Sequence, residues 1–364
     1  MLRGIVVAEF GRIFSAPLAG MILSDLGARV IKIERKGTGD ESRHYGAKIA
    51  DGISDYFFAL NRKKEIIQLD LKNKDDLHAA YNLLSESDVL IHNSLQRSFD
   101  ALGMSYEKIN KLNPRIIYAA ISGYGAGSKY KNTPSQDVTI QGLGGFMSLN
   151  GLSHETPVKT GVPVIDYVTG QNAVIGIIAA LMEREKTGKG CIVTTSLLES
   201  SISMTSVEAA RYLNTGAIAG RHGNRHHSIA PYNSYKTLDG HIIIAIANDE
   251  MFERFARAIG IDPSGFEKNQ QRLCRVEELE KIINERTGKF AACELVALLK
   301  EHKVSCGPIN NIAQALESEE VRELGIVEHE GGLKYIRTPI NFAANESTNK
   351  ASSGAVNNAE PVQI

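Results

Sequence analysis

Residues 4–33 read GIVVAEFGRIFSAPLAGMILSDLGARVIKI, and they predict one complete strand–helix–strand unit. Residues 4–10 and 29–33 are short runs rich in β-branched side chains, which favour strands. Residues 16–26 carry apolar side chains at helical spacing, with Pro17 near the start and Gly27 just after the end. Because parallel strands need such a crossover helix, the segment predicts the first unit of a parallel sheet.

The same alternation continues through the first half of the chain. Further strands are expected at residues 66–71, 88–91, 115–122 and 191–196, and helices at residues 74–85, 106–112, 171–186 and 197–213. The expected strands are nearly continuous apolar runs, which is typical of a parallel sheet covered by helices on both faces. We therefore predict an α/β fold with a Rossmann-like large domain built on a parallel sheet.

The second half of the chain has a different pattern. Residues 214–228 are rich in glycine and histidine and predict a linker or ordered loop. A hairpin around Asp239 and Gly240 follows, and then helices at residues 249–259, 276–285 and 291–302. We interpret this region as a smaller α+β domain that ends near Glu320. Strand-like runs are expected at residues 332–337 and 339–342, and the tail at 343–358 is expected to be loop.

Composition narrows the class of protein. The 364 residues are 43% hydrophobic and 23% charged, as in a globular enzyme of two domains. A net charge of −1 argues against a protein that binds nucleic acid by neutralising phosphates. The four cysteines lie far apart, without a CxxC pair, so we expect neither a metal site nor a disulfide framework. No long, purely apolar run is present, so we expect a cytoplasmic protein without membrane spans or a signal peptide.

Basic residues follow several of the expected strands. The first βα turn has no GxGxxG motif, which disfavours binding of NAD in the usual way. In open α/β sheets, ligands bind beyond the carboxyl ends of the strands, and cations there suggest a phosphate-bearing ligand. The alternative is that these side chains are simply solvated. The residues concerned are Arg35, Lys36, Lys63, Lys64 and Lys72.

Two aspartates precede expected helices. Asp166, in GVPVIDYVTG at residues 161–170, is either the N-cap of the long helix or an ionised carboxylate nucleophile that the helix dipole favours. Asp137 could form hydrogen bonds at the start of another helix, and a plain N-cap is the alternative. His226 and His227 suggest metal binding or acid–base chemistry, but no acidic or cysteine partner lies at ligand spacing, and a pair of loop histidines is the alternative.

The sequence resembles the CaiB/BaiF family, the class III CoA-transferases that include formyl-CoA transferase. The resemblance covers nearly the whole chain in order. The segments that carry it are FSAPLAGMILSDLGARVIKIERKGTGDESR (14–43), LNRKKEIIQLDLK (60–72), SDVLIHN (87–93), LNPRIIYAAISGYG (112–125), QGLGGFMSLNG (141–151), GVPVIDYVTGQNAVIGIIAALMEREKTGKG (161–190), GNRHHSIAPYNSYKTLDG (223–240) and CGPIN (306–310).

The resemblance implies an interlocked homodimer with its active site between domains of the two chains. It implies a large domain built from residues 1–213 and 333–364, a linker at 214–230, a small domain at 231–320 and a return linker at 321–332. The partners it implies are an acyl-CoA and a small carboxylic acid, without a metal, nucleic acid or membrane.

The resemblance also assigns site residues. Asp166 takes the position of the family's nucleophile. The coenzyme A contacts implied by similarity, with the last two beside the pantetheine arm, are Arg35, Leu69, Lys72, Asn93, Ser94, Gln136 and Asp137. The family chemistry is transfer of CoA from a thioester to an acid through an aspartyl anhydride and an aspartyl-CoA thioester, aided by backbone donors for which residues 142–145 (GLGG) are a candidate.

Two other functions stay open. One is an α-methylacyl-CoA racemase, which places a histidine just before the Asp137 position; Gln136 stands there instead, and an amide is not a general base. The other is an inactive CoA-binding relative, against which the retention of Asp166 argues. Phe14 replaces a glutamine of the formyl-CoA enzymes, whereas NRHHSIAPY at residues 224–232 resembles members acting on itaconate, mesaconate, succinate or aryl-substituted acids.

Overall fold

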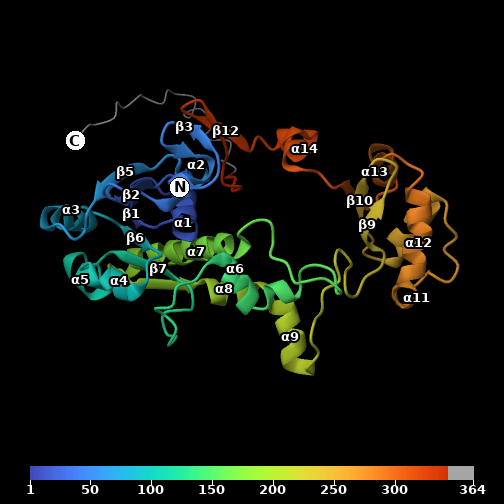
Figure 1. Ribbon diagram of the computed structural model, residues 1–364, viewed down its shortest axis with the longest axis horizontal. Coiled ribbons are helices and arrows are strands. Elements are labelled where there is room, and N and C mark those ends of the chain that lie inside the picture. Colours follow the sequence, from blue (N-terminus) through green and yellow to red (C-terminus); the bar gives the residue numbers. More distant parts are fainter. Residues whose placement is uncertain (343–364) are drawn as a thin grey trace.

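A six-stranded sheet forms the centre of the larger of two lobes in the computed structural model, which describes residues 1–342 (Figure 1). Its strand order is β5-β2-β1-β6-β7-β8, and every neighbouring pair is parallel. The strands are β1 (Val6–Phe10), β2 (Arg29–Arg35), β5 (Glu65–Leu69), β6 (Val89–His92), β7 (Ile117–Ser122) and β8 (Ile192–Ser196). The chain winds outward in opposite directions from β1, so the switch point lies between β1 and β6, as in Rossmann folds.

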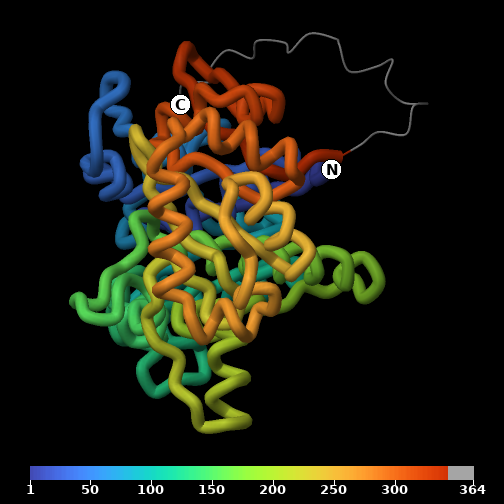
Figure 2. The backbone as a smooth tube through the Cα atoms, turned by 90° about the vertical axis from the view of Figure 1, so that its right-hand side faces the viewer, coloured from blue at the N-terminus to red at the C-terminus, as the bar shows by residue number. Residues whose placement is uncertain are grey.

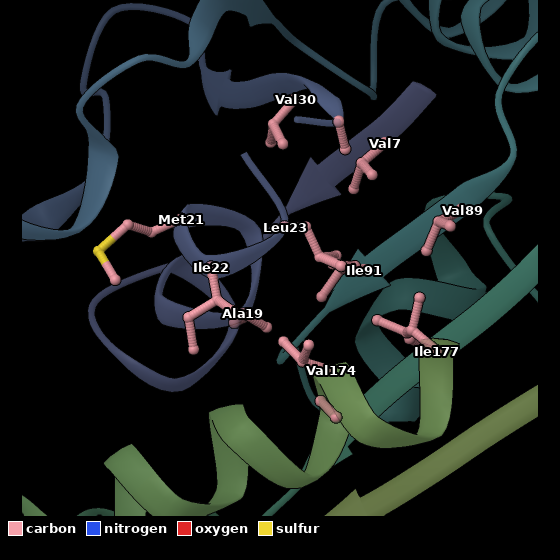
Figure 3. Packing of buried hydrophobic residues seen from close by; sticks show 14 of the residues in the cluster. Val7, Ala19, Met21, Ile22, Leu23, Val30, Val89, Ile91, Val174 and Ile177 are labelled. Atoms are coloured by element: carbon pink, nitrogen blue, oxygen red, sulfur yellow. The ribbon is translucent and has the colours of Figure 1, made fainter. Parts of the chain in front are cut away.

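Helices cover both faces of this sheet, which confirms the predicted α/β class. On one face, α1 (Ser15–Asp25) and α7 (Val164–Thr187) share an apolar core with the strands. Figure 3 shows Leu23 of α1 and Val174 of α7 packed beside Ile91 of β6. On the other face, α3 (Lys74–Ser85), α4 (Gln96–Ala101) and α5 (Tyr106–Leu112) enclose a second core.

The long helix α7 ends where the sequence predicts. Gly188 has a φ of 70°, and its N–H donates to the carbonyl of Arg184 at 2.8 Å. By length and composition α7 is the one helix of residues 1–342 that could cross a membrane, with a mean hydropathy of 1.5. Its apolar face contacts α1, β7, β8 and α8, which accounts for that composition.

Shorter elements connect these layers. They are the 3-10 turns at Glu41–His44 and Phe146–Ser148, β3 (Lys48–Ala50), β4 (Ile53–Ser54), α2 (Asp55–Asn61), α6 (Asp137–Leu143), α8 (Leu197–Met204) and α9 (Ser206–Thr215). The single helix predicted at residues 197–213 is therefore wrong. Thr205 interrupts it, because its hydroxyl donates to the carbonyl of Ile202 at 3.0 Å, in a stretch rich in serine and threonine that competes for backbone groups.

The smaller lobe has its own sheet and core. The antiparallel strands β9 (Tyr232–Lys236), β10 (His241–Ala245) and β11 (Ser305–Pro308) pack with α10 (Asp249–Ile259), α11 (Asn269–Cys274), α12 (Val276–Thr287) and α13 (Ala292–Glu301). Tyr235, Phe252 and Leu295 are among the core residues that these elements bury. The α+β composition predicted for this region is confirmed.

The chain then returns to the larger lobe, as the red segment in Figures 1 and 2 shows. The returning elements are α14 (Ile312–Glu317), α15 (Glu319–Glu323), β12 (Val327–Glu330) and β13 (Leu333–Ile336). Thr338 donates from its backbone N–H and its hydroxyl to the Asp25 carboxylate at 2.9 and 2.8 Å. Residues 339–342 do not form the predicted strand, and the tail predicted as loop lies outside the described residues.

Candidate active site

A cavity of about 710 Å³ opens at the carboxyl ends of β1, β2, β5 and β6. It therefore spans the switch point of the sheet, where ligands of open α/β folds bind. Four of the residues expected to contact coenzyme A line it: Arg35, Leu69, Lys72 and Ser94. Residues of the β1–α1 turn, including Gly11 and Arg12, form another part of its wall.

Arg35 and Lys72 give this cavity its available positive charge. Both side chains are exposed, and neither forms an ion pair with any residue in the range 1–342. By contrast, Arg12 on the same wall is paired with Glu41 at 2.7 Å. Two unpaired cations at strand ends suit the phosphates of a nucleotide.

The other three basic residues do not line this cavity, which corrects the sequence interpretation. Lys64 is fully buried, and its Nζ lies 2.7 Å from Oε2 of Glu9. Lys63 pairs with Asp25 and Glu328 at 3.4 and 3.3 Å. Lys36 is exposed and reaches Asp76 at 3.4 Å.

Asp166 lies in the first turn of α7, but it does not cap that helix. The N-cap is Pro163, and the carboxylate that accepts the N–H groups of Ile165 and Asp166, at 2.8 and 3.1 Å, belongs to Asp137. Asp137 is itself buried at the start of α6 and is held there by the amide of Gln141. The capping interpretation of Asp166 is therefore wrong, and its carboxylate is left available for another task.

The surroundings of Asp166 disfavour its charge. Burial, and secondly the nearby charge of Asp137, raise its pKa from 3.8 to about 7, while a hydrogen bond from the Ser15 side chain lowers it. The sequence predicted that the helix dipole would keep Asp166 ionised. Instead, Asp137 accepts the N–H groups at the start of α7, where the helix dipole favours a negative charge. Burial and the charge of Asp137 disfavour the ionised form of Asp166.

Aromatic rings enclose the approach to Asp166. Phe14 packs edge-to-face on Tyr56 with 6.0 Å between ring centroids, and Tyr56 packs in the same way on Tyr45 at 5.6 Å. Tyr167, next to Asp166, lies 6.4 Å from Phe14. Burial, and secondly the charge of Asp166, raise the pKa of Tyr56 to about 12, so its hydroxyl stays protonated near the carboxylate.

The comparison with known proteins now decides the family, because the model of CoA-transferase family III matches residues 2–356. The chain belongs to this family. The succinate–glutarate CoA-transferase of Agrobacterium fabrum is 34% identical over 354 residues, covering 93% of this chain and 88% of that protein. The human succinyl-CoA:glutarate CoA-transferase is 33% identical over 330 residues, covering 90% and 75%.

A solved structure agrees with this assignment. The crystal structure of a CaiB/BaiF family protein from Brucella suis matches with a TM-score of 0.88 at 34% identity, covering 94% of this chain and 92% of that one. The resemblance found in the sequence is thereby confirmed, and with it membership among the CoA-transferases.

In this CoA-transferase family III chain, Asn93 connects the cavity to Asp166. Its side-chain amide accepts from the N–H of Arg12 at 2.9 Å and donates to the carbonyl of Arg12 at 2.8 Å. The same amide nitrogen lies 3.5 Å from Oγ of Ser15, which bonds Asp166. Asn93 does not line the cavity itself, whereas the adjacent Ser94 does.

The remaining candidates lie apart from the cavity. Gln136 is exposed at the N-cap of α6, next to Asp137. In the GLGG segment, the N–H groups of Gly144 and Gly145 already donate to Ile140 and Gly142, so they are poor candidates for oxyanion donors.

His226 and His227 stack on one another with ring centroids 4.6 Å apart. Among residues 1–342, no group of three or more histidine, cysteine or acidic side chains is arranged to hold a metal ion. The two histidines instead border a smaller hollow of about 350 Å³ with Arg211 and His222.

Sequence reasoning missed Ser15 and Tyr56 in this family III enzyme. Both lie in helices whose sequences are mainly apolar, so their polar side chains did not stand out as site residues. Only the packing of α1 and α2 near α7 brings them close to Asp166. A serine directly ahead of the apolar run of α1 carries no local signal of such a role.

Proposed function

We propose that the protein transfers coenzyme A from an acyl-CoA thioester to a carboxylic acid, with Asp166 as the acyl acceptor. The observation that carries the proposal is that Asp166 is a desolvated carboxylate without a capping role, in an aromatic enclosure next to the β1–α1 turn. A carboxylate stripped of water and placed beside a like charge is a better nucleophile than a solvated one.

The cavity at the strand ends supplies the place for the nucleotide. Arg35 and Lys72 would bind phosphate groups of the 3′-phospho-ADP moiety, and Leu69 and Ser94 would border it. The pantetheine arm would then run past the β1–α1 turn, fixed by Asn93, toward Asp166. Gln136 and Asp137 lie at the Asp166 end of that path.

The reaction that follows is a series of acyl exchanges. The Asp166 carboxylate attacks the thioester carbonyl, the C–S bond breaks, and CoA leaves as the thiolate while a mixed anhydride forms. The thiolate attacks the aspartyl carbonyl and releases the donor acid as a carboxylate, which leaves an aspartyl-CoA thioester. The acceptor carboxylate displaces the thiolate to form a second anhydride, and attack of the thiolate on the acceptor acyl carbon regenerates Asp166. Enclosure by Phe14 and Tyr56 limits hydrolysis of the anhydrides.

Dicarboxylic acids are the acceptors that we propose to test first. The relatives named above act on succinyl-CoA and glutarate, and a further relative from Haloarcula hispanica, 31% identical over 327 residues, is a succinyl-CoA:mesaconate CoA-transferase. The segment around His226 and His227 resembles members with such substrates, and Arg211 and His222 add positive character there.

We also propose an interlocked homodimer. The two lobes are joined by two separate connections, one after α9 and one through α14 (Figure 1). Large apolar side chains remain exposed along α9 and the connection that follows it, including Leu213 and Ile218, at 79% and 86% exposure. Association of two chains would cover this surface.

The test is a screen of succinyl-CoA and acetyl-CoA against glutarate, mesaconate, malate, oxalate and butyrate, read by the mass of the new thioester. Asp166→Asn should abolish transfer while leaving CoA affinity, measured by calorimetry, nearly unchanged. Hydroxylamine added with donor should label the Asp166 peptide of the wild type only.

Three outcomes would contradict the proposal. Transfer by Asp166→Asn would exclude Asp166 as acyl acceptor. Incorporation of solvent deuterium at the α-carbon of an acyl-CoA, without any acceptor acid, would favour the racemase. CoA binding without transfer to any acid in a broad panel would favour the inactive relative.

A further inference from the structure

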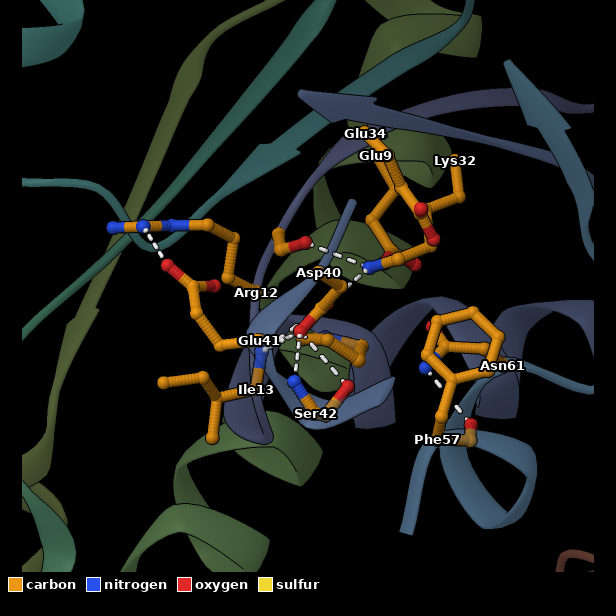
Figure 4. Close-up of polar contacts among 12 residues, drawn as sticks. Glu9, Arg12, Ile13, Lys32, Glu34, Asp40, Glu41, Ser42, Phe57 and Asn61 are labelled. Atoms are coloured by element: carbon orange, nitrogen blue, oxygen red, sulfur yellow. Dashed lines mark hydrogen bonds and ion pairs between the residues drawn. The ribbon is translucent and has the colours of Figure 1, made fainter. Parts of the chain in front are cut away.

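Four charged side chains, Glu9, Lys32, Asp40 and Lys64, form a buried ionic network beneath the β1–α1 turn, and Figure 4 shows the first three of them. Nζ of Lys32 lies 3.1 Å from Oε1 of Glu9 and 2.9 Å from Oδ2 of Asp40, and Nζ of Lys64 lies 2.7 Å from Oε2 of Glu9. No side chain of the four is more than 1% exposed. Two cations balance two anions, so the network carries no net charge.

The network is attached directly to the turn between β1 and α1. Lys32 donates to the carbonyl of Gly11 at 2.8 Å, and the N–H of Ile13 donates to the Asp40 carboxylate at 3.2 and 3.3 Å. Ile13 has a φ of 66°, in the left-handed region that a β-branched residue enters only when its surroundings force it. The bond from its N–H to Asp40 is such a constraint.

Helix α1 is seated on the same network. Lys64 donates to the carbonyl of Pro17 at 2.8 Å. A Cβ on Gly20 would lie 1.9 Å from Oε2 of Glu9, so the helix backbone and the buried carboxylate are already in close contact. The first turn of α1, which carries Ser15, is therefore fixed relative to the four charges.

The turn has a site at each of its ends. Gly11, Arg12 and Asp40 border the cavity at the strand ends. At the other end, Ser15 is close enough to Asp166 to lower the pKa of its carboxyl group, so only a few residues of chain separate the cavity wall from the carboxylate. The shape of this turn sets the distance between the two sites.

We propose that Lys32 and Asp40 are positioning residues, which hold Ile13 in its left-handed conformation and so keep Ser15 on Asp166 while Gly11 and Arg12 border the cavity. This rests on the proposed function, because the reaction needs a thioester anchored in the cavity to reach Asp166. Neither residue contacts the reacting atoms, and their contribution is alignment.

Both groups remain charged at neutral pH. Burial alone would lower the pKa of Lys32, but the carboxylates of Glu9 and Asp40 raise it above its ordinary value. Burial alone would raise the pKa of Asp40, and Lys32 and the Ser42 donors hold it below its usual range. The bonds that Lys32 and Asp40 make to the turn therefore persist across the pH range in which Asp166 titrates, whereas burial lowers the pKa of Lys64, which binds Pro17 of α1, to about 8.

The experiment measures the rate of Asp166 acylation by hydroxylamine trapping, as a function of pH, together with the Kd for CoA. Asp40→Asn should slow acylation about 100-fold through misalignment, with the Kd for CoA changed less than about threefold. The pH midpoint of acylation should move upward, as in Ser15→Ala, because a displaced Ser15 no longer stabilises the charged form of Asp166. Asp137 and Tyr56, the other titratable groups that face Asp166, are left in place.

Two further variants separate alignment from loss of stability. Asp88→Asn removes a partly buried ion pair next to β6, with Arg184 at 2.9 Å, and should leave the pH midpoint unchanged. Adding Ile13→Gly to Asp40→Asn should recover about tenfold in acylation, because glycine adopts a positive φ without the strain that isoleucine carries. Adding Ile13→Val should recover nothing.

The proposal is overturned if Asp40→Asn behaves like Asp88→Asn, or if Ile13→Val rescues as well as Ile13→Gly. If Asp40→Asn does not fold, Ser42→Ala replaces it in the test. This variant removes one donor at 2.8 Å from Asp40 and keeps all four charges, and it should move the pH midpoint in the same direction. An unchanged midpoint there would also overturn it. Wild-type transfer by Asp166→Asn would refute the proposed function instead, whatever Asp40→Asn shows.

Discussion

Replacing Asp166 by asparagine should stabilise the folded protein at neutral and alkaline pH. A pKa raised from 3.8 to about 7 means that the folded chain disfavours the ionised carboxylate. The full shift corresponds to about 4 kcal/mol between the two protonation states. Water reaches part of this half-buried group, so we expect a gain of about 2 kcal/mol in the free energy of unfolding for the neutral amide.

The gain should depend on pH in one direction. Below about pH 4, Asp166 is protonated in both the folded and the unfolded chain, so it does not lower the free energy of unfolding. As the pH rises from 4 to 7, the unfolded chain ionises Asp166 and the folded chain resists, and the wild type loses stability that Asp166→Asn keeps. Above pH 7 the difference is constant.

Urea unfolding at pH 4.5 and 8.0 measures this difference. The chain contains no tryptophan, so far-UV circular dichroism is the suitable probe. All samples are compared at one protein concentration, because the stability of a self-associating chain depends on its concentration. Asp262→Asn is a matched control, because Asp262 is an exposed turn residue of the small lobe whose pKa is lowered by bonds from Ser264. Asp262→Asn should leave the free energy of unfolding unchanged or lower it at both pH values. Equal stability of wild type and Asp166→Asn at pH 8.0 would refute the reasoning.

Three other predictions concern neighbouring features. Arg35→Ala or Lys72→Ala should weaken CoA binding about tenfold, and by less for dephospho-CoA, as calorimetry at fixed salt would show; equal losses for both ligands would count against a phosphate contact. Asp137→Asn, which keeps an oxygen to accept the N–H groups at the start of α7, should shift the pH dependence of Asp166 acylation to lower pH, because a like charge is gone; a shift to higher pH would contradict this. Gly20→Ala should destabilise the fold by about 2 kcal/mol, because its Cβ would clash with Glu9. The control is Gly142→Ala, whose Cβ would meet only Met147 at 3.7 Å, and thermal unfolding should show no loss of stability for it.

Local patterns sufficed for much of the architecture. The helices predicted at residues 74–85, 106–112 and 249–259 have those bounds in the structure. Each has a capping side chain next to a periodic apolar face, as with Asn73 ahead of α3, so every signal lies within the segment itself. The parallel sheet followed from apolar strands separated by helices for the same reason.

The site depended on partners that local patterns do not contain. Asp166 was a reasonable N-cap by residue type, but the carboxylate that caps α7 comes from Asp137, on another helix. Only the packing of α6 on α7 decides which of the two aspartates caps and which is desolvated. The family resemblance reached Asp166 by another route, because it compares whole motifs; the roles it assigns remain predictions.

The buried network did leave a trace in the sequence. Glu9 and Lys32 each interrupt an apolar strand run, and buried charges of opposite sign must be paired. Glu9 and Lys32 are directly opposite each other on the adjacent strands β1 and β2. Lys64, by contrast, was interpreted with the other lysines as a ligand contact, because nothing nearby in the sequence shows that its side chain points into the protein.

The cost that Asp166 imposes on the fold has a use in the proposed reaction. Each covalent intermediate, anhydride or thioester, converts the Asp166 carboxylate into a neutral acyl group. That conversion removes the repulsion from Asp137 and the penalty of burying a charge, so the site favours the acylated states over the free carboxylate. A solvated aspartate at the same position would be more stable before reaction and would gain less from it. The stability gained in Asp166→Asn and the driving force for acylation have the same origin, so the two should vary together. Asp137→Asn lowers the free energy needed to ionise Asp166. It should therefore also reduce the fraction of enzyme that accumulates as the acyl intermediate.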